Sequence, residues 1–272
     1  MEKGELYLVA TPIGNMEDIT FRAIRVLKNV DLIAAEDTRQ ILKLLNHFEI
    51  SKPLISYHRH NEKDRVDLLI NKLKSGENIA IVSDAGTPGI CDPGEEVVKK
   101  AIENSINIVP IPGACALINA LIASGLDTKE FSFYGFLPTN KKLRKQKYDE
   151  LMEDSKTIII YEAPHRILNT LNEISNLLGN REIAVAKELT KMHEKFYRGN
   201  INEIYEEIGE PKGEYIVIIK GEKTKKENVL NSLTIEQHYE YYEKKGLDKK
   251  EIIKRIAKDR KVNKNEIYKR FL

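Results

Sequence analysis

Short apolar runs alternate with amphipathic segments through the first half of the chain. Within residues 18–29, for example, Ile19, Ala23 and Leu27 recur at the spacing of one helix face. The apolar runs that predict strands lie at residues 6–10, 32–35, 54–56, 79–82 and 106–111. Because these runs lack polar alternation, helices should cover both faces of the sheet, which favours a mostly parallel sheet.

The rhythm changes after Gly125. An aromatic segment, FSFYGFLP, is followed by a charged helical bridge over residues 141–156. Further strand candidates lie at residues 157–161, 182–186, 195–199 and 215–220. A short turn joins the middle two, so we expect a second α/β domain whose sheet contains antiparallel strands.

A polar, basic linker over residues 221–228 leads into the C-terminal segment. Two helix patterns, at residues 249–258 and 264–271, predict a small unit that resembles a helix-turn-helix. The expected architecture is therefore α/β, with two α/β domains and a helical appendage. The domains are expected at residues 1–125, 126–221 and 229–272.

The net charge of the chain is only +2, but the charge is unevenly distributed. Residues 244–272 contain 12 Lys/Arg against 4 Asp/Glu, a net charge of +8, which leaves about −6 for the rest. Such a segment suits a polyanionic partner, and a solvated lysine-rich helix face explains it equally well. The N-terminus has no signal-peptide pattern and no apolar stretch reaches the length of a membrane span, so we expect a cytoplasmic protein.

Three loops rich in glycine and proline follow apolar runs: TPIGN, SDAGTPGICDPG and PGACA. Ligands of parallel sheets bind beyond the carboxyl ends of the strands, where glycine permits close approach of the backbone. Asp84 and Asp92 of the second loop can accept hydrogen bonds from ligand hydroxyl or amino groups. A purely structural loop is the alternative, but the repetition of the pattern favours a binding site.

Several other kinds of site are disfavoured. The chain has no GxxxxGK[ST] motif, and Gly86, Gly89 and Gly94 do not fit GxGxxG, which argues against a P-loop enzyme and against dinucleotide hydride transfer. Cys91 and Cys115 form no CxxC pair, so neither a disulfide framework nor a thiolate zinc site is indicated.

Longer motifs carry a resemblance to a known family. They are LYLVATPIGNMEDITFRAIRVLKNVDLIAAEDTR, IAIVSDAGTPGICDPG, VPIPGACALINALIASGL, FSFYGFLP, IIIYEAPHRI and VAKELTKMHEKFYRG. In this order they closely resemble the ribosomal RNA small-subunit cytidine-2′-O-methyltransferases of the tetrapyrrole-methylase (class III) superfamily, over residues 6–221. The resemblance implies a homodimer of two-domain α/β chains with S-adenosylmethionine in the cleft between the domains. It also implies 16S rRNA, within the 30S subunit, as substrate.

The resemblance also places the cofactor against particular residues. From the first domain these are Pro12, Gly14, Asp84, Ala85, Gly86, Thr87, Pro88, Ile90, Asp92, Pro112, Gly113, Ala114, Cys115 and Ala116. From the second they are Tyr134, Gly135, Phe136 and Glu162. The chain reads PGACA where many members of the superfamily read PGPSA, so one hydroxyl that could bind the cofactor is replaced by a thiol of similar size.

The implied reaction is attack of a ribose 2′-oxygen on an activated methyl group. Orientation can contribute roughly 7–11 kcal/mol to such a step, and a positioned base about 3–5 kcal/mol, so positioning should dominate. The candidate bases are Lys187, Glu188, Glu36, Asp37 and His58. We favour Lys187 if desolvation lowers its pKa, and a salt bridge with neighbouring carboxylates is its alternative role.

Basic side chains suited to RNA phosphates occur in three places. The candidates are Arg39, His58, Arg59, His60 and Arg166. Residues 141–147 and the C-terminal unit extend the possible footprint, with charged solvated surfaces as the alternative. The two histidines lie two positions apart without further metal-like partners, so no metal site is expected.

Two other functions compete with RNA methylation. One is methylation of a tetrapyrrole carbon by a member of the same superfamily, against which the basic tail argues. The other is a nucleic-acid-binding regulator whose α/β part senses a nucleotide-like ligand without catalysis.

Overall fold

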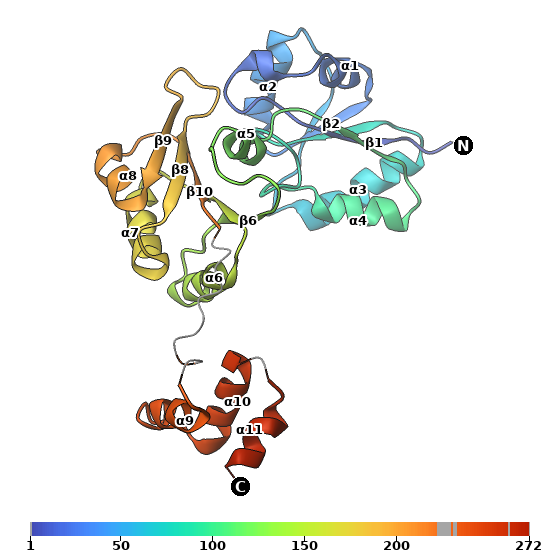
Figure 1. Ribbon diagram of the computed structural model, residues 1–272. Helices are drawn as coiled ribbons and strands as arrows, with labels where there is room; N and C mark the ends of the chain where they lie inside the picture. Colours follow the sequence, from blue (N-terminus) through green and yellow to red (C-terminus); the bar gives the residue numbers. More distant parts are fainter. Residues whose placement is uncertain (1, 222–229, 231–232, 261, 272) are drawn as a thin grey trace. The chain divides into compact units, whose positions relative to one another are not determined.

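Two sheets and a separate helical unit make up the described part of the protein (Figure 1). The structure, a computed structural model, describes residues 2–221, 230, 233–260 and 262–271. The chain divides into two units, Met1–Lys220 and Gly221–Leu272, and both sheets belong to the first. Apart from Gly221, the linker expected over residues 221–228 lies outside the described residues.

The first sheet is entirely parallel and has the strand order β3-β2-β4-β1-β5. Its strands are β1 (Leu6–Val9), β2 (Leu32–Ala35), β3 (Leu54–Ser56), β4 (Ile79–Val82) and β5 (Ile108–Ile111). This confirms the expected parallel sheet. β1 lies between β4 and β5, so the loops that follow these three strands emerge next to one another.

Helices cover both faces of the first sheet. α1 (Phe21–Asn29) and α2 (Thr38–His47) pack on one face, and α3 (Glu62–Lys74) and α4 (Glu95–Glu103) on the other (Figure 1). The helix expected at residues 18–29 starts later than predicted. Asp18 instead ends a short 3-10 helix, Met16–Asp18. α1 begins after Thr20, whose hydroxyl accepts a hydrogen bond from the backbone N–H of Ala23 at 3.0 Å, an N-cap that fixes the start.

The second sheet has the order β6-β7-β10-β8-β9. Its strands are β6 (Phe131–Phe136), β7 (Thr157–Glu162), β8 (Glu182–Lys187), β9 (Lys195–Asn200) and β10 (Tyr215–Ile219). β6 and β7 are parallel and the other pairs are antiparallel, as the short turn between β8 and β9 predicts.

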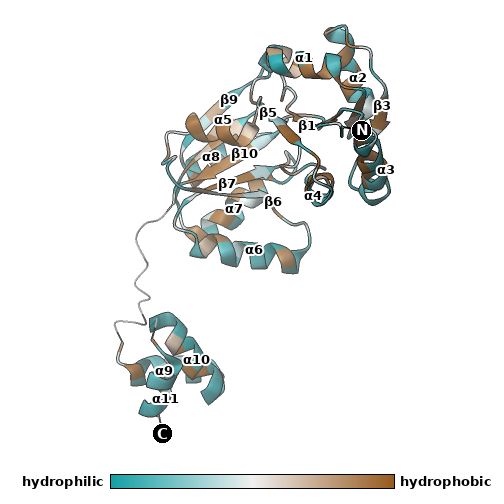
Figure 2. Ribbon diagram, turned by 90° about the vertical axis from the view of Figure 1, so that its right-hand side faces the viewer, coloured by the Kyte–Doolittle hydropathy of each residue, from teal (hydrophilic) through white to brown (hydrophobic). Residues whose placement is uncertain are grey.

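The two faces of the second sheet have different covers. α6 (Lys141–Glu153), α7 (Ile167–Leu178) and α8 (Ile201–Ile208) pack on one face, with Tyr215 and Val217 of β10 beneath them. Ile216 and Ile218 point to the other face, against α5 (Ala116–Ile122). Figure 2 shows β7 and β10 mostly brown and the outer helix α6 mostly teal. α5 therefore follows the last strand of the first sheet along the chain, but it packs against the second sheet.

The C-terminal unit contains three described helices, α9 (Ile235–Glu243), α10 (Lys249–Arg260) and α11 (Lys264–Arg270). Only the last two were expected. The apolar pattern of α9 is weak because it buries His238 and Tyr242 rather than aliphatic side chains. Ile252, Ile256 and Ile267 complete a small core with them. Among the helices that the structure describes, none combines the length and the apolar character of a bilayer span.

The burial of His238 makes this unit sensitive to acid. Its ring stacks on Tyr242, lies 3.2 Å from the Asp259 carboxylate (Nε2 to Oδ2) and accepts a hydrogen bond from Arg260. Burial lowers the pKa of His238 below 6.5, and Asp259 offsets part of this effect. The unfolded chain therefore binds a proton more readily than the folded unit. The free energy of unfolding of the unit should be largest above about pH 6.5, and it should fall as the pH drops toward the lower pKa that His238 has in the folded unit.

This prediction can be tested by hydrogen exchange of the full chain, with His238→Phe as the reference at each pH. Exchange in α9 and α10 of the wild type should accelerate relative to the variant between about pH 7 and pH 5. A ratio of exchange rates that is independent of pH would contradict it.

Candidate active site

The three glycine- and proline-rich loops meet at the carboxyl edge of the first sheet, as expected. Thr11 and Gly86 exchange two backbone hydrogen bonds, of 2.9 and 3.0 Å, which join the loops after β1 and β4. The hydroxyl of Thr87 donates to the carbonyl of Ala114 at 3.2 Å, which joins the loops after β4 and β5. The convergence follows from strand order, because β4, β1 and β5 are adjacent.

Two glycines allow this close packing. Gly86 has φ +82°, a conformation that L side chains rarely adopt, and a Cβ there would lie 3.2 Å from Cγ2 of Ile13. A Cβ on Gly14 would lie 2.5 Å from Cγ of Lys191 and 2.9 Å from Oγ1 of Thr190. The loop after β1 is therefore pressed against the loop after β8, which belongs to the second sheet.

A cavity of about 390 Å³ lies where these loops face the second sheet. This volume is within the range of small-molecule sites, roughly 300–1,000 Å³. The predicted residues that line it are Ala85, Gly86, Thr87, Ile90, Asp92, Cys115, Ala116, Phe136 and Glu162. The other lining residues are Ile13, Cys91, Tyr161, Ala163, Pro164, Ala186, Leu189, Glu214, Tyr215 and Ile216.

The second sheet contributes an apolar wall to this cavity. Phe136 and Tyr161 meet edge to face with ring centroids 5.6 Å apart, and Ile216 lies on the same side of the sheet. The hydroxyl of Tyr161 accepts a hydrogen bond from the backbone N–H of Leu117 at 3.0 Å. This bond holds the ring in place and satisfies one N–H of the first turn of α5.

One corner of the cavity is polar, because the lining residue Asp92 interacts electrostatically with Glu36 and Asp84, which lie outside the lining. Burial, followed by the charge of Glu36, raises the pKa of Asp92 to about 6. Burial and the charge of Asp84 also raise the pKa of Glu36. The nearby charge of Arg59, whose guanidinium donates a hydrogen bond to the carbonyl of Cys91, offsets part of both effects. The corner thus favours a ligand that brings positive charge or hydrogen-bond donors.

Glu162 lines the cavity, but its carboxylate is already satisfied. It accepts hydrogen bonds from Arg166 (2.7 Å), Thr170 (2.7 Å) and the backbone N–H of Ala163 (2.8 Å). The Arg166 guanidinium also donates to the carbonyl of Leu137 at 3.1 Å. The side chains of Glu162 and Arg166 are 0% and 19% exposed. Their hydrogen bonds connect β7, the start of α7 and the residue that follows β6. Contact of Arg166 with RNA stays a prediction.

Several other predicted cofactor residues lie outside the lining. They are Pro12, Gly14, Asp84, Pro88, Pro112, Gly113, Ala114, Tyr134 and Gly135. Most of them shape the loops around the cavity. The Asp84 carboxylate accepts the backbone N–H of Asp37 at 2.8 Å, and a Cβ on Gly135 would lie 3.0 Å from Sγ of Cys91. Tyr134 faces the other side of the sheet, where its hydroxyl donates to Asp154 at 3.0 Å. A role for these residues in cofactor binding remains a prediction.

The lining residues that the sequence missed are of two kinds. Ile13 and Cys91 lie inside the quoted motifs, so the loop pattern already pointed to their neighbourhood. Glu214, Tyr215 and Ile216 lie at the start of β10 or just before it, outside every quoted motif. No local signal distinguishes them, because their place in the lining depends on how the two sheets meet.

The predicted bases differ in how they are placed. The Glu188 carboxylate accepts hydrogen bonds from Lys191 (2.9 Å) and from the backbone N–H of Glu214 (2.9 Å). Although burial raises the pKa of Glu188, these bonds outweigh it and hold the pKa below its ordinary value. Lys187 ends β8 between the lining residues Ala186 and Leu189, but it does not line the cavity itself. Glu36 interacts electrostatically with Asp92, and Asp92 lines the cavity.

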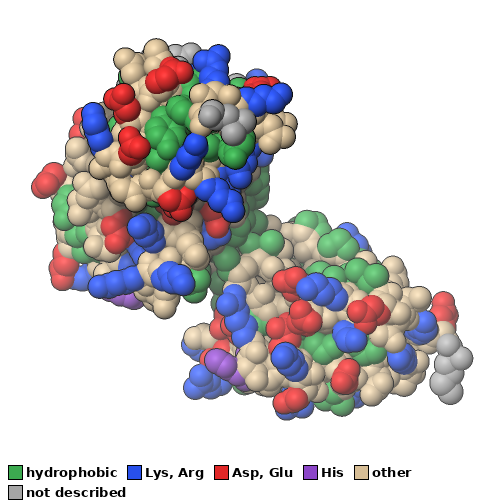
Figure 3. All heavy atoms as spheres, turned by 90° about the horizontal axis from the view of Figure 1, so that it is seen from below, with side chains coloured by type: hydrophobic (Ala, Val, Ile, Leu, Met, Phe, Trp, Pro, Cys, Tyr) green, Lys and Arg blue, Asp and Glu red, His purple; other side chains and the backbone are tan. Residues whose placement is uncertain are grey.

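The side chains expected to bind RNA lie in several separate places. Arg39 is 88% exposed and forms a 2.7 Å ion pair with Asp37. The rings of His58 and His60 meet edge to face with their centroids 5.9 Å apart. In the basic segment 141–147, Arg144 is mostly buried against Glu173, at 2.7 Å. On the face drawn in Figure 3, Lys and Arg side chains are mixed with Asp and Glu side chains. Contact with RNA is not tested by this arrangement and stays a prediction.

Comparisons with known proteins show the family of the chain. The family model described as Tetrapyrrole (Corrin/Porphyrin) Methylases matches residues 5–205. Ribosomal RNA small subunit methyltransferase I of Halalkalibacterium halodurans is 52% identical, over 98% of this chain and 94% of its own length. The protein of the same name from Bacillus subtilis is 50% identical over the same shares.

Solved structures share the fold at low sequence identity. Uroporphyrin-III C-methyl transferase from Thermus thermophilus, complexed with S-adenyl homocysteine, has a TM-score of 0.56 at 18% identity, covering 85% of this chain and 100% of its own. Diphthine synthase has a TM-score of 0.61 at 14% identity, covering 80% and 90%. The expected two-sheet α/β fold is confirmed. The chain is a methyltransferase that belongs to the tetrapyrrole methylase family and, within it, to the ribosomal RNA small subunit methyltransferase I proteins.

Proposed function

We propose that this protein transfers a methyl group from S-adenosylmethionine to the ribose 2′-hydroxyl of a cytidine in small-subunit ribosomal RNA, within the 30S subunit, in the cytoplasm and as a homodimer. The observation that carries the proposal is the cavity at the meeting point of the three loops, in a chain about half identical to ribosomal RNA small subunit methyltransferases I. The uneven charge supports an RNA substrate over a tetrapyrrole.

The lining of the cavity fits the proposed cofactor. The rings of Phe136 and Tyr161 with Ile216 offer an apolar surface to the adenine. The carboxylate of Asp92 suits the ribose hydroxyls or the ammonium group of the cofactor. Cys115, where many members of the superfamily have a serine, lines the cavity. When bound, S-adenosylmethionine supplies a methyl group activated by its sulfonium.

The residues of this chain would act mainly by positioning. The 2′-oxygen must approach in line with the bond to the methyl group, and the hydroxyl proton must leave to an acceptor. Among the predicted bases we favour Glu36, because its raised pKa and its electrostatic interaction with the lining residue Asp92 suit proton acceptance at the polar corner. Glu188 is engaged by Lys191 and by a backbone N–H. Neither Glu36 nor Lys187 lines the cavity itself.

The raised pKa of Asp92 predicts that cofactor affinity depends on pH. A cationic ligand prefers the ionised carboxylate, whose pKa in the free protein is about 6. Affinity for S-adenosylmethionine should therefore be constant above that pH and fall by up to about tenfold per pH unit below it. Calorimetry on Asp92→Asn should show weaker binding with a flatter profile. Wild-type affinity that stays constant between about pH 5 and pH 8 would contradict the assignment.

The substrate is tested by the position of a transferred label. The protein is incubated with tritiated S-adenosylmethionine and with undermethylated 30S subunits, naked rRNA or a precorrin-type tetrapyrrole. We expect label on a cytidine ribose, and more of it with 30S subunits than with naked rRNA. Label on the tetrapyrrole alone would reject the RNA substrate, and cofactor binding without label on any substrate would favour a ligand sensor.

A further inference from the structure

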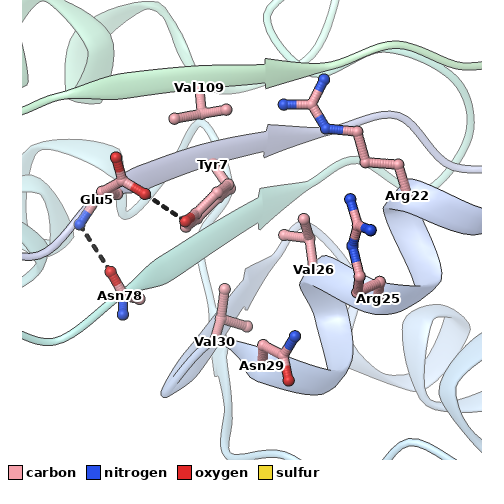
Figure 4. A pocket seen from close by; sticks show the side chains of 9 residues that line it. All are labelled: Glu5, Tyr7, Arg22, Arg25, Val26, Asn29, Val30, Asn78 and Val109. Atoms are coloured by element: carbon pink, nitrogen blue, oxygen red, sulfur yellow. Dashed lines mark hydrogen bonds between the residues drawn. The ribbon is translucent and has the colours of Figure 1, made fainter.

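A second hollow, of about 440 Å³, lies beneath α1 and is separate from the candidate active site. We call it the α1 pocket. Its lining residues are Glu5, Tyr7, Arg22, Arg25, Val26, Asn29, Val30, Asn78 and Val109 (Figure 4). None of them lines the first cavity. Glu5 and Asn78 immediately precede β1 and β4, so the α1 pocket lies toward the amino ends of these strands, whereas the first cavity lies beyond their carboxyl ends.

The pocket exists because α1 covers its face of the sheet incompletely. β5 is an edge strand, and Val109 on β5 and Tyr7 on β1 are only partly buried beside the core under α1. Val26 of α1 and Val30, which follows the last residue of α1, also line the hollow. The floor of the hollow is therefore apolar, with polar side chains around it.

Two arginines on α1 carry unpaired positive charge at this pocket. Arg22 and Arg25 are three positions apart, so they lie on the same face of the helix. Both are exposed, and within residues 2–221 neither guanidinium has a hydrogen-bond or ion-pair partner. Figure 4 shows both guanidinium groups on one side of the pocket. Two free guanidinium groups on one helix face suit the planar, multidentate recognition of a phosphate group.

The other side of the pocket is negative and already organised. The hydroxyl of Tyr7 and the amide of Asn107 each donate a hydrogen bond to the Glu5 carboxylate. These bonds lower the pKa of Glu5, so it stays ionised at neutral pH. Figure 4 places Glu5 and Asn78 across the pocket from the arginines. A bare phosphate would satisfy only one side, whereas a ligand with an anionic end and a hydrogen-bond-donating end would satisfy both.

A nucleotide unit has this distribution of groups. Its phosphate is anionic, its base has an apolar face, and its exocyclic amine and sugar hydroxyls are donors. We propose that the α1 pocket binds a nucleotide of the RNA substrate at a distance from the methylated residue, with its phosphate on Arg22 and Arg25. The inference rests on the proposed function. β1 has four residues and spans roughly 13 Å, so a folded RNA can reach both edges of the sheet.

The test compares two double variants of the full chain. Arg22→Gln with Arg25→Gln removes the proposed phosphate contacts, and Lys99→Gln with Lys100→Gln makes the same charge change on α4, where both lysines are exposed. Small-subunit rRNA affinity is measured over a range of salt concentrations. The arginine variant should bind roughly 10–100-fold more weakly, and its salt slope should be shallower by about 0.7–0.9, because the two arginines share one phosphate. The lysine variant should bind like the wild type.

Three further measurements separate the possible failures. The affinity for S-adenosylmethionine and the melting temperature should be the same in all three proteins, because the first cavity is untouched. Equal RNA affinity in wild type and arginine variant, or an equal loss in the lysine variant, would overturn the inference while the proposed function stands. A wild type that binds neither small-subunit rRNA nor 30S subunits would refute the proposed function itself. Binding of cytidine monophosphate that depends on Arg22 and Arg25, with unchanged RNA affinity, would indicate a free-nucleotide pocket and also overturn the inference.

Discussion

Ala116→Phe is expected to weaken binding of S-adenosylmethionine about 100-fold and to abolish methyl transfer at ordinary cofactor concentrations. Ala116 is the first residue of α5 and lines the cavity opposite the second sheet. A phenyl ring there has to share a space of about 390 Å³ with the cofactor, between loops that hydrogen bonds already hold together. Calorimetry gives the affinity, and transfer of tritium gives the activity.

The matched control makes the same substitution at the other end of the same helix. Ala123 follows the last residue of α5, is exposed and does not line the cavity. Ala123→Phe should keep cofactor affinity within about threefold of the wild type, because no buried space is altered. If Ala116→Phe binds the cofactor as the wild type does, the cofactor site lies elsewhere and the proposed active site is wrong.

Arg166→Leu is expected to lower the free energy of unfolding by about 3–5 kcal/mol. The substitution leaves the Glu162 carboxylate, which is 0% exposed, without its charged partner. Thr170 and the backbone N–H of Ala163 still donate hydrogen bonds, but neither brings a compensating charge. Urea unfolding of the full chain, followed by circular dichroism, measures the change.

An exposed ion pair of the same spacing serves as control. Lys99 pairs with Glu95 at 2.7 Å, also four residues apart, but these side chains are 56% and 75% exposed. Lys99→Leu should therefore change the free energy of unfolding by about 0–1 kcal/mol. A loss below about 1 kcal/mol in Arg166→Leu, combined with a large loss of RNA affinity, would instead support the RNA contact predicted for Arg166.

The alternation of apolar runs and helical patterns was sufficient to predict the parallel first sheet and the mixed second sheet. These features depend on side-chain period and turn length, which are local properties. The loops after β1, β4 and β5 could also be predicted from the sequence, because glycine is typical of tight loops. Gly86, for example, has a positive φ that other residue types rarely adopt. The helix α9 was missed because His238 and Tyr242 form its buried face, and neither is counted as an aliphatic core residue.

What the sequence alone determined is therefore the set of elements, the three loops and the long motifs of the family. The wall made by Phe136, Tyr161 and Ile216, and the pairing of Glu162 with Arg166, were decided by the tertiary structure. The grouping of Arg22 and Arg25 with Glu5 was also decided there. The physical reason is that burial and pKa depend on side chains from several elements, which come together only when the chain is folded.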